Sequence, residues 1–199
     1  GQKTEAYKAL KRVIRSNPPY ELSFNAQILQ TEAMAAGNHG KMVKKLRRMA
    51  RNKKNKDYQD QIYYAIGNIY LANNDTAHCI GAYEKGAEES TQNGIAKAML
   101  LLRLGGIYWD KKDYINAQRC YAELVGILDK EHEDYKEVER RSAALTEVEP
   151  HLSAIKLQDS LQWLAKLPEA ERNKAIDYVI EELKKKEKEE ARKAMHAEM

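Results

Sequence analysis

Several residue types that define special classes of protein are scarce in this sequence. Of its 199 residues, 2 are cysteine, 4 are proline, 10 are glycine and 1 is phenylalanine. Cys79 and Cys120 are far apart, so they indicate neither a disulfide framework nor a zinc site. No run of about 18 apolar residues occurs, so we expect no transmembrane helix. The first residues lack the apolar stretch of an export signal, and we expect the sequence to be part of a longer protein.

Motifs of catalysis are missing as well. The sequence contains no G-x-S-x-G, P-loop, H-E-x-x-H or G-x-G-x-x-G pattern. Its histidines are isolated, and the neighbours His78 and Cys79 would point about 100° apart on a helix, so they would not easily share a metal ion. We therefore expect no enzyme, no catalytic residue, no cofactor and no metal site.

Positive charge is concentrated at the beginning of the sequence. Residues 1–56 contain 14 Lys and Arg against 3 Asp and Glu, residues 57–130 contain 7 against 10, and residues 131–199 contain 13 against 17. These segments carry net charges of +11, −3 and −4, although the whole chain carries only +4. The asymmetry indicates a basic end that meets an acidic partner or the acidic part of this chain.

Apolar residues recur at steps of three and four, which predicts helices throughout. One pattern occurs twice: Tyr63-x2-Ile66-Gly67-x2-Tyr70 with Cys79-x3-Tyr83, and Leu101-x2-Leu104-Gly105-x2-Tyr108 with Ala117-x3-Tyr121. It is similar to the W-x2-L-G-x2-Y…A-x3-F pattern of the tetratricopeptide (TPR) repeat. The two glycines are 38 residues apart, and we expect the excess over about 34 residues in a loop at 90–94.

Weaker copies of the pattern are predicted upstream. A first helix with a core face at Ala26, Leu29, Gln30 and Ala33, a turn at 37–40 and a second helix over 42–49 form one unit. A leading half-repeat ends near Pro18. Because no single helix pair buries its apolar face alone, such units stack into a solenoid. We therefore predict an all-α, TPR-like helical solenoid over residues 1–130, with about three repeats plus a leading half-repeat.

The pattern stops after residue 130, and residues 131–199 are predicted to form a helical extension or cap. A helix over 134–147 is expected to end near Pro150, a second over 152–167 to stop before Pro168, and a third to begin there. The apolar stripe of 152–164 either covers the last repeat or is offered to a partner. The charged tail 184–199 is either a solvated helix or disordered.

The inner face of a TPR solenoid is lined by the first helix of each repeat, and ligands usually lie there. Projecting the register gives a groove of amide and aromatic side chains, which suits a peptide. Its predicted members are Phe24, Gln27, Thr31, Gln61, Tyr64, Asn68, Met99, Leu102 and Trp109. For Tyr64 and Trp109 the alternative is packing beneath the helical extension.

Residues 41–56 carry nine cations and no carboxylate. Met42, Leu46 and Met49 give this run one apolar stripe, which predicts a second repeat helix with a cationic outer face. The predicted basic docking face consists of Lys44, Lys45, Arg47, Arg48 and Arg51. This face is either simply solvated or binds an acidic protein surface. Nucleic acid or anionic lipid is less expected, because no aromatic residues alternate with the cations.

Three stretches resemble one bacterial family. They are residues 60–69, residues 113–118 and, above all, Gln158-Asp159-Ser160-Leu161-Gln162-x-Leu164-Ala165-x-Leu167-Pro168-Glu169-Ala170-Glu171-Arg172-Asn173. The family is that of the SprE/PorW TPR-containing lipoproteins of the type IX secretion and gliding machinery, and the resemblance covers most of residues 57–180.

This resemblance implies a protein on the periplasmic face of the outer membrane that connects the PorK/PorN ring to the Sov translocon. Attachment to the membrane would come only from a lipid anchor outside this chain. The resemblance implies no catalysis and no cofactor, and it transfers no ligand residue to a single position. We also expect no small-molecule substrate and no nucleic acid as a partner. The alternative is a cytoplasmic TPR adaptor that binds a peptide or an RNA.

Overall fold

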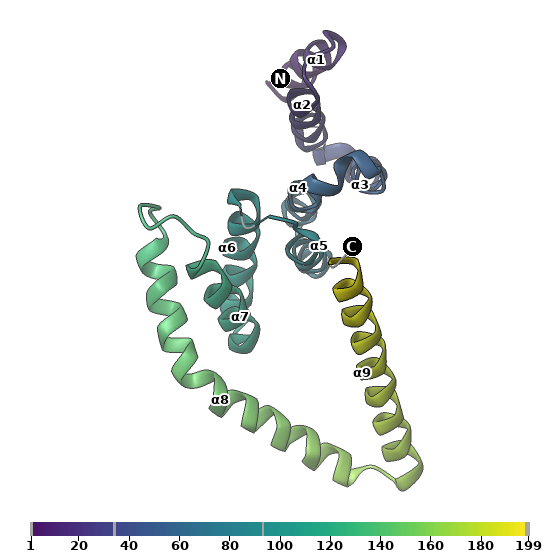
Figure 1. The fold of residues 1–199 in the computed structure, drawn as a ribbon, viewed down its shortest axis with the longest axis vertical. Helices are drawn as coiled ribbons and strands as arrows, with labels where there is room; N and C mark the ends of the chain where they lie inside the picture. The colour runs from purple at the N-terminus through teal and green to yellow at the C-terminus, as the bar shows by residue number, and fades with distance from the viewer. Residues whose placement is uncertain (1, 34, 93, 198–199) are drawn as a thin grey trace. The chain divides into compact units, whose positions relative to one another are not determined.

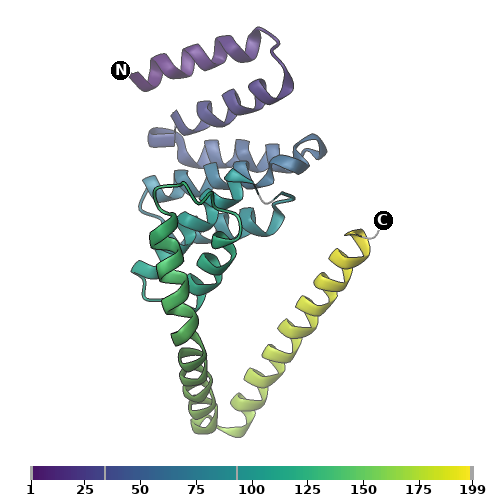
Figure 2. The ribbon, with the colours of Figure 1, turned by 60° about the vertical axis from the view of Figure 1, so that its left-hand side comes forward.

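In the computed structural model, which describes residues 2–33, 35–92 and 94–197, every regular element is a helix (Figures 1 and 2). The elements are α1 (Gln2–Arg15), α2 (Tyr20–Ala33), α3 (Ala35–Ala50), the 3₁₀-helix η1 (Lys53–Tyr58), α4 (Gln59–Ala72), α5 (Thr76–Glu89), α6 (Ile95–Asp110), α7 (Tyr114–Val125), α8 (Tyr135–Lys166) and α9 (Glu169–Ala197). The predicted all-α, TPR-like solenoid is confirmed.

The chain divides into two compact units, Gly1–Glu149 and Pro150–Met199. The first contains α1 to α7 and the beginning of α8, and the second contains the rest of α8 and α9. From α1 to α7, each helix packs mainly against a helix that is its neighbour along the chain. This nearest-neighbour packing is typical of a solenoid. The predicted domain boundary at residue 130 stays a prediction.

Two glycine–tyrosine contacts explain the repeated pattern. The ring of buried Tyr83 on α5 lies so close to Gly67 on α4 that a Cβ atom there would overlap it. Gly105 on α6 and Tyr121 on α7 repeat the contact, and a Cβ at Gly105 would lie 2.8 Å from Tyr121 Cε1. Each glycine therefore lets the second helix of its pair approach closely.

The turns inside the two helix pairs are equivalent as well. Asn74 and Lys112 have positive φ angles of 59° and 60°. The next residues, Asp75 and Asp113, accept hydrogen bonds from the backbone N–H three positions further on, at 3.1 and 3.4 Å. Each aspartate therefore caps the N-terminus of the second helix of its pair.

The segment before α4 departs from the predicted repeat. The turn predicted at 37–40 lies inside α3, because this helix begins at Ala35. The basic run is not one helix either, since α3 ends at Ala50 and η1 follows. Asn52 begins η1 by accepting a hydrogen bond from the Lys54 N–H at 3.1 Å. Five of the nine cations therefore lie on α3 and three on η1, and Arg51 lies in the turn between these helices.

The register of α2 also differs from the prediction. Ala26 and Gln30 are buried, as the prediction requires, but Leu29, which we expect in the core, is 51% exposed, and Thr31, which we expect in the groove, is buried. This segment has no glycine–tyrosine pair to fix the register, so the apolar pattern alone left it undetermined by about one residue.

Helix α8 continues through Pro150, although we expected a helix to end there. Proline lacks the N–H that would bind the carbonyl four residues earlier, so the helix loses one hydrogen bond but is not interrupted. Before the proline, Tyr135, Val138 and Leu145 are buried in the core that α6 and α7 also form. The first part of α8 therefore covers the last repeat.

In the second unit, the carbonyl of Pro168 accepts the N–H groups of Glu171 and Arg172 at 3.0 and 2.9 Å, where α9 begins. Residues 184–197 are helical, and residues 198–199 lie outside the described residues. Large apolar side chains of both helices are exposed: Ile155, Leu157, Leu161, Trp163, Ile176, Tyr178, Val179, Ile180 and Leu183. The choice between a cap and a partner surface for 152–164 stays a prediction. Nowhere in the described ranges is a helix both long and apolar enough for a membrane span.

Candidate protein-binding surfaces

The groove residues predicted on α4 lie beside Tyr83. The Tyr64 ring stacks on the Tyr83 ring with a centroid distance of 5.8 Å and an interplanar angle of 20°. The Tyr83 hydroxyl donates a 2.7 Å hydrogen bond to Asn68 Oδ1, and burial raises the pKa of this hydroxyl. Gln61 lies half-buried on the same helix. Tyr64 and Asn68 therefore form a fixed polar and aromatic edge.

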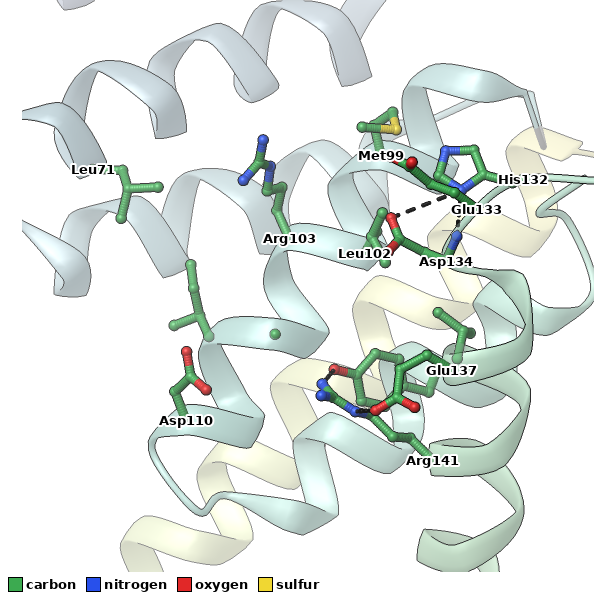
Figure 3. Close-up of a pocket in the computed structure, with 14 residues that line it drawn as sticks. Leu71, Met99, Leu102, Arg103, Asp110, His132, Glu133, Asp134, Glu137 and Arg141 are labelled. Atoms are coloured by element: carbon green, nitrogen blue, oxygen red, sulfur yellow. Dashed lines mark hydrogen bonds and ion pairs between the residues drawn. The ribbon is translucent and has the colours of Figure 1, made fainter.

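Next to this edge, α6 carries an open pocket of about 490 Å³ (Figure 3). The end of α4, the face of α6 and the beginning of α8 line it, and Met99 and Leu102 from the predicted groove are among its residues. Leu71, Leu102 and Ile107 supply apolar surface. Gly106 leaves the α6 backbone open, because a Cβ there would meet no atom within 4 Å. A partner can therefore approach α6 closely at this point.

Charged side chains surround the apolar surface of the pocket (Figure 3). Arg103 and Arg141 supply two guanidinium groups. The lining carboxylates are those of Asp110, Glu133, Asp134 and Glu137. Carboxylates therefore outnumber guanidinium groups, and the pocket offers both apolar and charged contacts to a partner.

Trp109, the last predicted groove residue, lies beneath α8. The Cζ atom of Arg141 is 4.5 Å from the centroid of the Trp109 ring. Arg141 also donates hydrogen bonds to the Tyr121 hydroxyl at 3.0 Å and to Glu137 at 2.7 Å. Trp109 therefore packs beneath the helical extension, which is the alternative considered above, and it is not one of the pocket-lining residues.

Glu137 holds Arg141 in this position. It accepts hydrogen bonds from Arg140 and Arg141, and these bonds lower the pKa of the Glu137 carboxyl below its ordinary value. Glu137 is therefore ionised at neutral pH, and the Glu137–Arg141 ion pair forms part of the pocket wall.

Two groove residues predicted on α2 are core residues instead. Phe24 is 2% exposed, and its ring lies 4.5 Å from the Tyr58 ring of η1 between centroids. Thr31 is 0% exposed, and its hydroxyl donates to the Ile28 carbonyl at 2.6 Å. Gln27 is half-buried on the same helix. Phe24 and Thr31 cannot line an open groove, because the shifted register of α2 turns them inward.

The basic docking face is exposed at four of its five predicted residues, namely Lys44, Arg47, Arg48 and Arg51. Lys45 is half-buried, its Nζ donates to Gln30 Oε1 at 3.1 Å, and burial lowers its pKa. No ion pair between side chains that the structure describes involves a cation of 41–56. This charge is therefore available to a partner.

The sequence did not identify Arg103, Glu137 or Arg141 as parts of a binding surface. Arg141 and Trp109 are 32 residues apart and lie on different helices, so no local pattern connects them. The amphipathic pattern of 134–147 predicted the helix that carries Arg141, but it did not predict that Arg141 contacts Trp109.

No group of three or more His, Cys, Asp or Glu side chains suited to a metal ion occurs among the described residues. Cys79 and Cys120 are both buried free thiols.

Residues 60–93 and 100–127 match the family model of the tetratricopeptide repeat. The first range covers nearly the whole pair α4–α5, and the second covers most of α6 and all of α7. No curated protein matches the chain at a significant level. The fold and the matched repeats define a TPR-containing protein of the helical-solenoid class, and such proteins are typically non-enzymatic scaffolds whose repeats bind other proteins.

Proposed function

We propose that this protein is a non-enzymatic scaffold of type IX secretion and gliding motility that connects the PorK/PorN ring to the Sov translocon. It would act at the periplasmic face of the outer membrane, as a lipoprotein whose anchor lies outside this chain. The observation that carries the proposal is that one solenoid combines an open pocket with a basic face that has no ion-pair partner among the described side chains. The resemblance of residues 158–173 to the SprE/PorW family supports the secretion role.

The pocket suits a protein segment better than a small polar molecule. Its apolar wall of Leu71, Leu102 and Ile107 accommodates a large apolar side chain, and the charged rim orients the groups beside it. The open backbone at Gly106 lets the partner's own chain come close. These features favour recognition by a few anchoring side chains.

The basic face suits an acidic protein. Exposed charges on two partners steer their encounter and raise the association rate, and salt weakens both effects. Because Lys44, Arg47 and Arg48 are exposed, they can pair with carboxylates without first breaking an internal salt bridge. Binding through this face is therefore expected to be salt-sensitive.

A cross-linking pull-down from the native cell envelope tests the role of the pocket. We expect Gly106→Leu to fill the pocket and to reduce capture of ring and translocon components about 10-fold or more. Gly81→Leu is the matched control, because Gly81 lies in the middle of α5 and a Cβ there also meets no atom within 4 Å. Equal capture by both variants would exclude the pocket as the binding site.

The same pull-down tests the basic face. We expect the triple variant Lys44→Glu, Arg47→Glu and Arg48→Glu to lose capture of these components. A variant with Lys184→Glu, Lys186→Glu and Lys188→Glu changes the net charge equally but lies on α9, and it should retain capture. Unchanged capture by the α3 variant would remove the basic face from the proposal.

The nine cations of 41–56 also favour a second candidate, an adaptor that binds an RNA. Tight binding of unstructured RNA with a steep salt dependence, together with no capture of secretion components, would select this alternative.

A further inference from the structure

The first unit of the chain carries opposite charge at its two ends. Residues 1–56 carry a net charge of +11, and exposed cations of α1 and α3 contribute most of it. We call these cations the basic end. Residues 129–139 contain six carboxylates against two lysines. We call the exposed Glu131, Glu133 and Glu139 the acidic end.

Solenoid packing keeps these ends apart. Helix α3 packs against α4, α4 against α5 and α5 against α6, whereas the beginning of α8 joins the core of α6 and α7. Both ends belong to the unit Gly1–Glu149, so α4 to α6 lie between them. Among the side chains that the structure describes, no ion pair joins the basic end to the acidic end.

Neither end is neutralised by its own neighbours. The exposed cations of α1 and α3 form no ion pair with side chains that the structure describes, and the same holds for Glu131, Glu133 and Glu139. By contrast, Glu137 is paired with Arg140 and Arg141. Charge is therefore left over at both ends, with opposite signs.

Apolar surface accompanies the charge at each end. Leu22 and Leu29 of α2, which packs against α3, are 52% and 51% exposed. Near the acidic end, Glu133 belongs to the same pocket as Leu102 and Ile107. Apolar side chains are therefore exposed on the helix that packs against α3, and others line the pocket that contains Glu133.

We infer that the basic end of one copy docks on the acidic end and the adjoining pocket of a second copy, head to tail. This inference rests on the proposed docking role of the basic face, and it names a second copy of this chain as a partner. Because the contact uses two different surfaces of the protein, each copy keeps one unoccupied end, and copies can add one after another into an open chain or a closed ring. Head-to-head and tail-to-tail contacts would bring charges of the same sign together, and their repulsion opposes both arrangements.

Sedimentation of the purified chain tests the association. At about 0.02 M salt, where screening is weak, we expect the average mass to rise with concentration beyond that of a dimer. At about 0.5 M salt, we expect the 22.9 kDa monomer and an affinity at least about 10-fold weaker. A monomer at every concentration in low salt would overturn the inference.

Two neutralised variants test the geometry. Variant one carries Lys44→Gln, Arg47→Gln and Arg48→Gln, and variant two carries Glu131→Gln, Glu133→Gln and Glu139→Gln. Each keeps only one functional end, so we expect each alone to be monomeric and an equimolar mixture to form a 1:1 dimer that grows no further. Formation of this dimer also shows that both variants are folded. A mixture that stays monomeric would overturn the inference.

A matched control separates position from net charge. Lys184→Gln, Lys186→Gln and Lys188→Gln lower the net charge by the same amount as variant one, but they lie on α9. We expect this control to associate like the wild type, and loss of its association would overturn the inference. If the purified chain stays monomeric while the α3 variant still loses capture of envelope proteins, the inference fails and the proposed function stands.

Discussion

The guanidinium group of Arg141 on α8 lies over the indole ring of Trp109 on α6, with 4.5 Å between Cζ and the ring centroid. This contact joins the helix that follows the last repeat to the helix that supplies one wall of the pocket. Glu137 and the Tyr121 hydroxyl accept hydrogen bonds from the same guanidinium. One side chain therefore connects the capping part of α8 to both helices of the last repeat.

Removing Arg141 is expected to destabilise the last repeat. Arg141→Ala loses the cation–π contact and the hydrogen bond to buried Tyr121, which we expect to lower the free energy of unfolding by about 1–2 kcal/mol. Urea denaturation measures this change. Arg140→Ala is the control, because Arg140 also pairs with Glu137, but its side chain is 75% exposed. We expect an effect of about 0–0.5 kcal/mol from the control. Equal effects of the two substitutions would contradict the assigned role of Arg141.

Alanine substitutions at two neighbouring glycines of α6 are expected to change the free energy of unfolding in opposite directions. A Cβ at Gly105 would lie 2.8 Å from the buried Tyr121 ring, so Gly105→Ala should lower the free energy of unfolding by about 1–3 kcal/mol. Gly106→Ala meets no atom within 4 Å and should raise it by about 0.5–1 kcal/mol through helix propensity. Thermal or urea unfolding of the two variants tests this, and a stabilising Gly105→Ala would be inconsistent with the close packing of α6 and α7.

The helix cap at Asp75 is expected to be sensitive to acid. The backbone N–H of His78 donates to this carboxylate, and the His78 ring lies 2.8 Å from it, so the Asp75 pKa is lowered. A carboxyl group with a lowered pKa stabilises the fold above the ordinary Asp pKa of about 4, and this contribution disappears as the pH falls through the lower folded pKa.

The measurement is the stability difference between wild type and Asp75→Asn as a function of pH. We expect a constant advantage for the wild type near pH 5 that shrinks below about pH 4. An advantage that is independent of pH, or that grows on acidification, would show that the Asp75 pKa is not lowered.

The thiol of Cys120 is expected to be unreactive in the folded protein. Burial raises its pKa to about 12, so almost no thiolate exists at pH 8. We expect alkylation by iodoacetamide to be roughly 1000-fold slower than in urea-unfolded protein, as followed by mass spectrometry. Rapid labelling of the native chain would mean that α7 is not packed as described.

Local sequence patterns predicted the helix pairs that contain the full repeat pattern. The repeat pattern that contains Gly67 and Gly105 predicted these pairs, and in the structure each glycine lets a tyrosine ring of the second helix, Tyr83 or Tyr121, reach the backbone of the first. The same patterns were insufficient for Phe24 and Thr31, because α2 lacks such a pair and its register depends on packing against η1 and α4.

Contacts between distant helices could not be predicted in the same way. Arg141 contacts Trp109 because the first part of α8 packs on the last repeat, and no periodicity in the sequence encodes this contact. Pro150 indicated a helix end by local rules, yet the residues on both sides continue the helix through it. Met99 and Leu102, which the repeat register of α6 assigned to the groove, line the pocket, and their role in binding stays a prediction.

The most direct test of the scaffold function is photo-cross-linking in the native envelope, with a photoreactive residue at position 106 or at position 81. Both positions are open helix glycines, but only Gly106 lies in the pocket. We expect position 106 to form adducts with ring or translocon proteins and position 81 to form few. Equal adducts at both positions, or none with a protein at position 106, would contradict the proposed scaffold function.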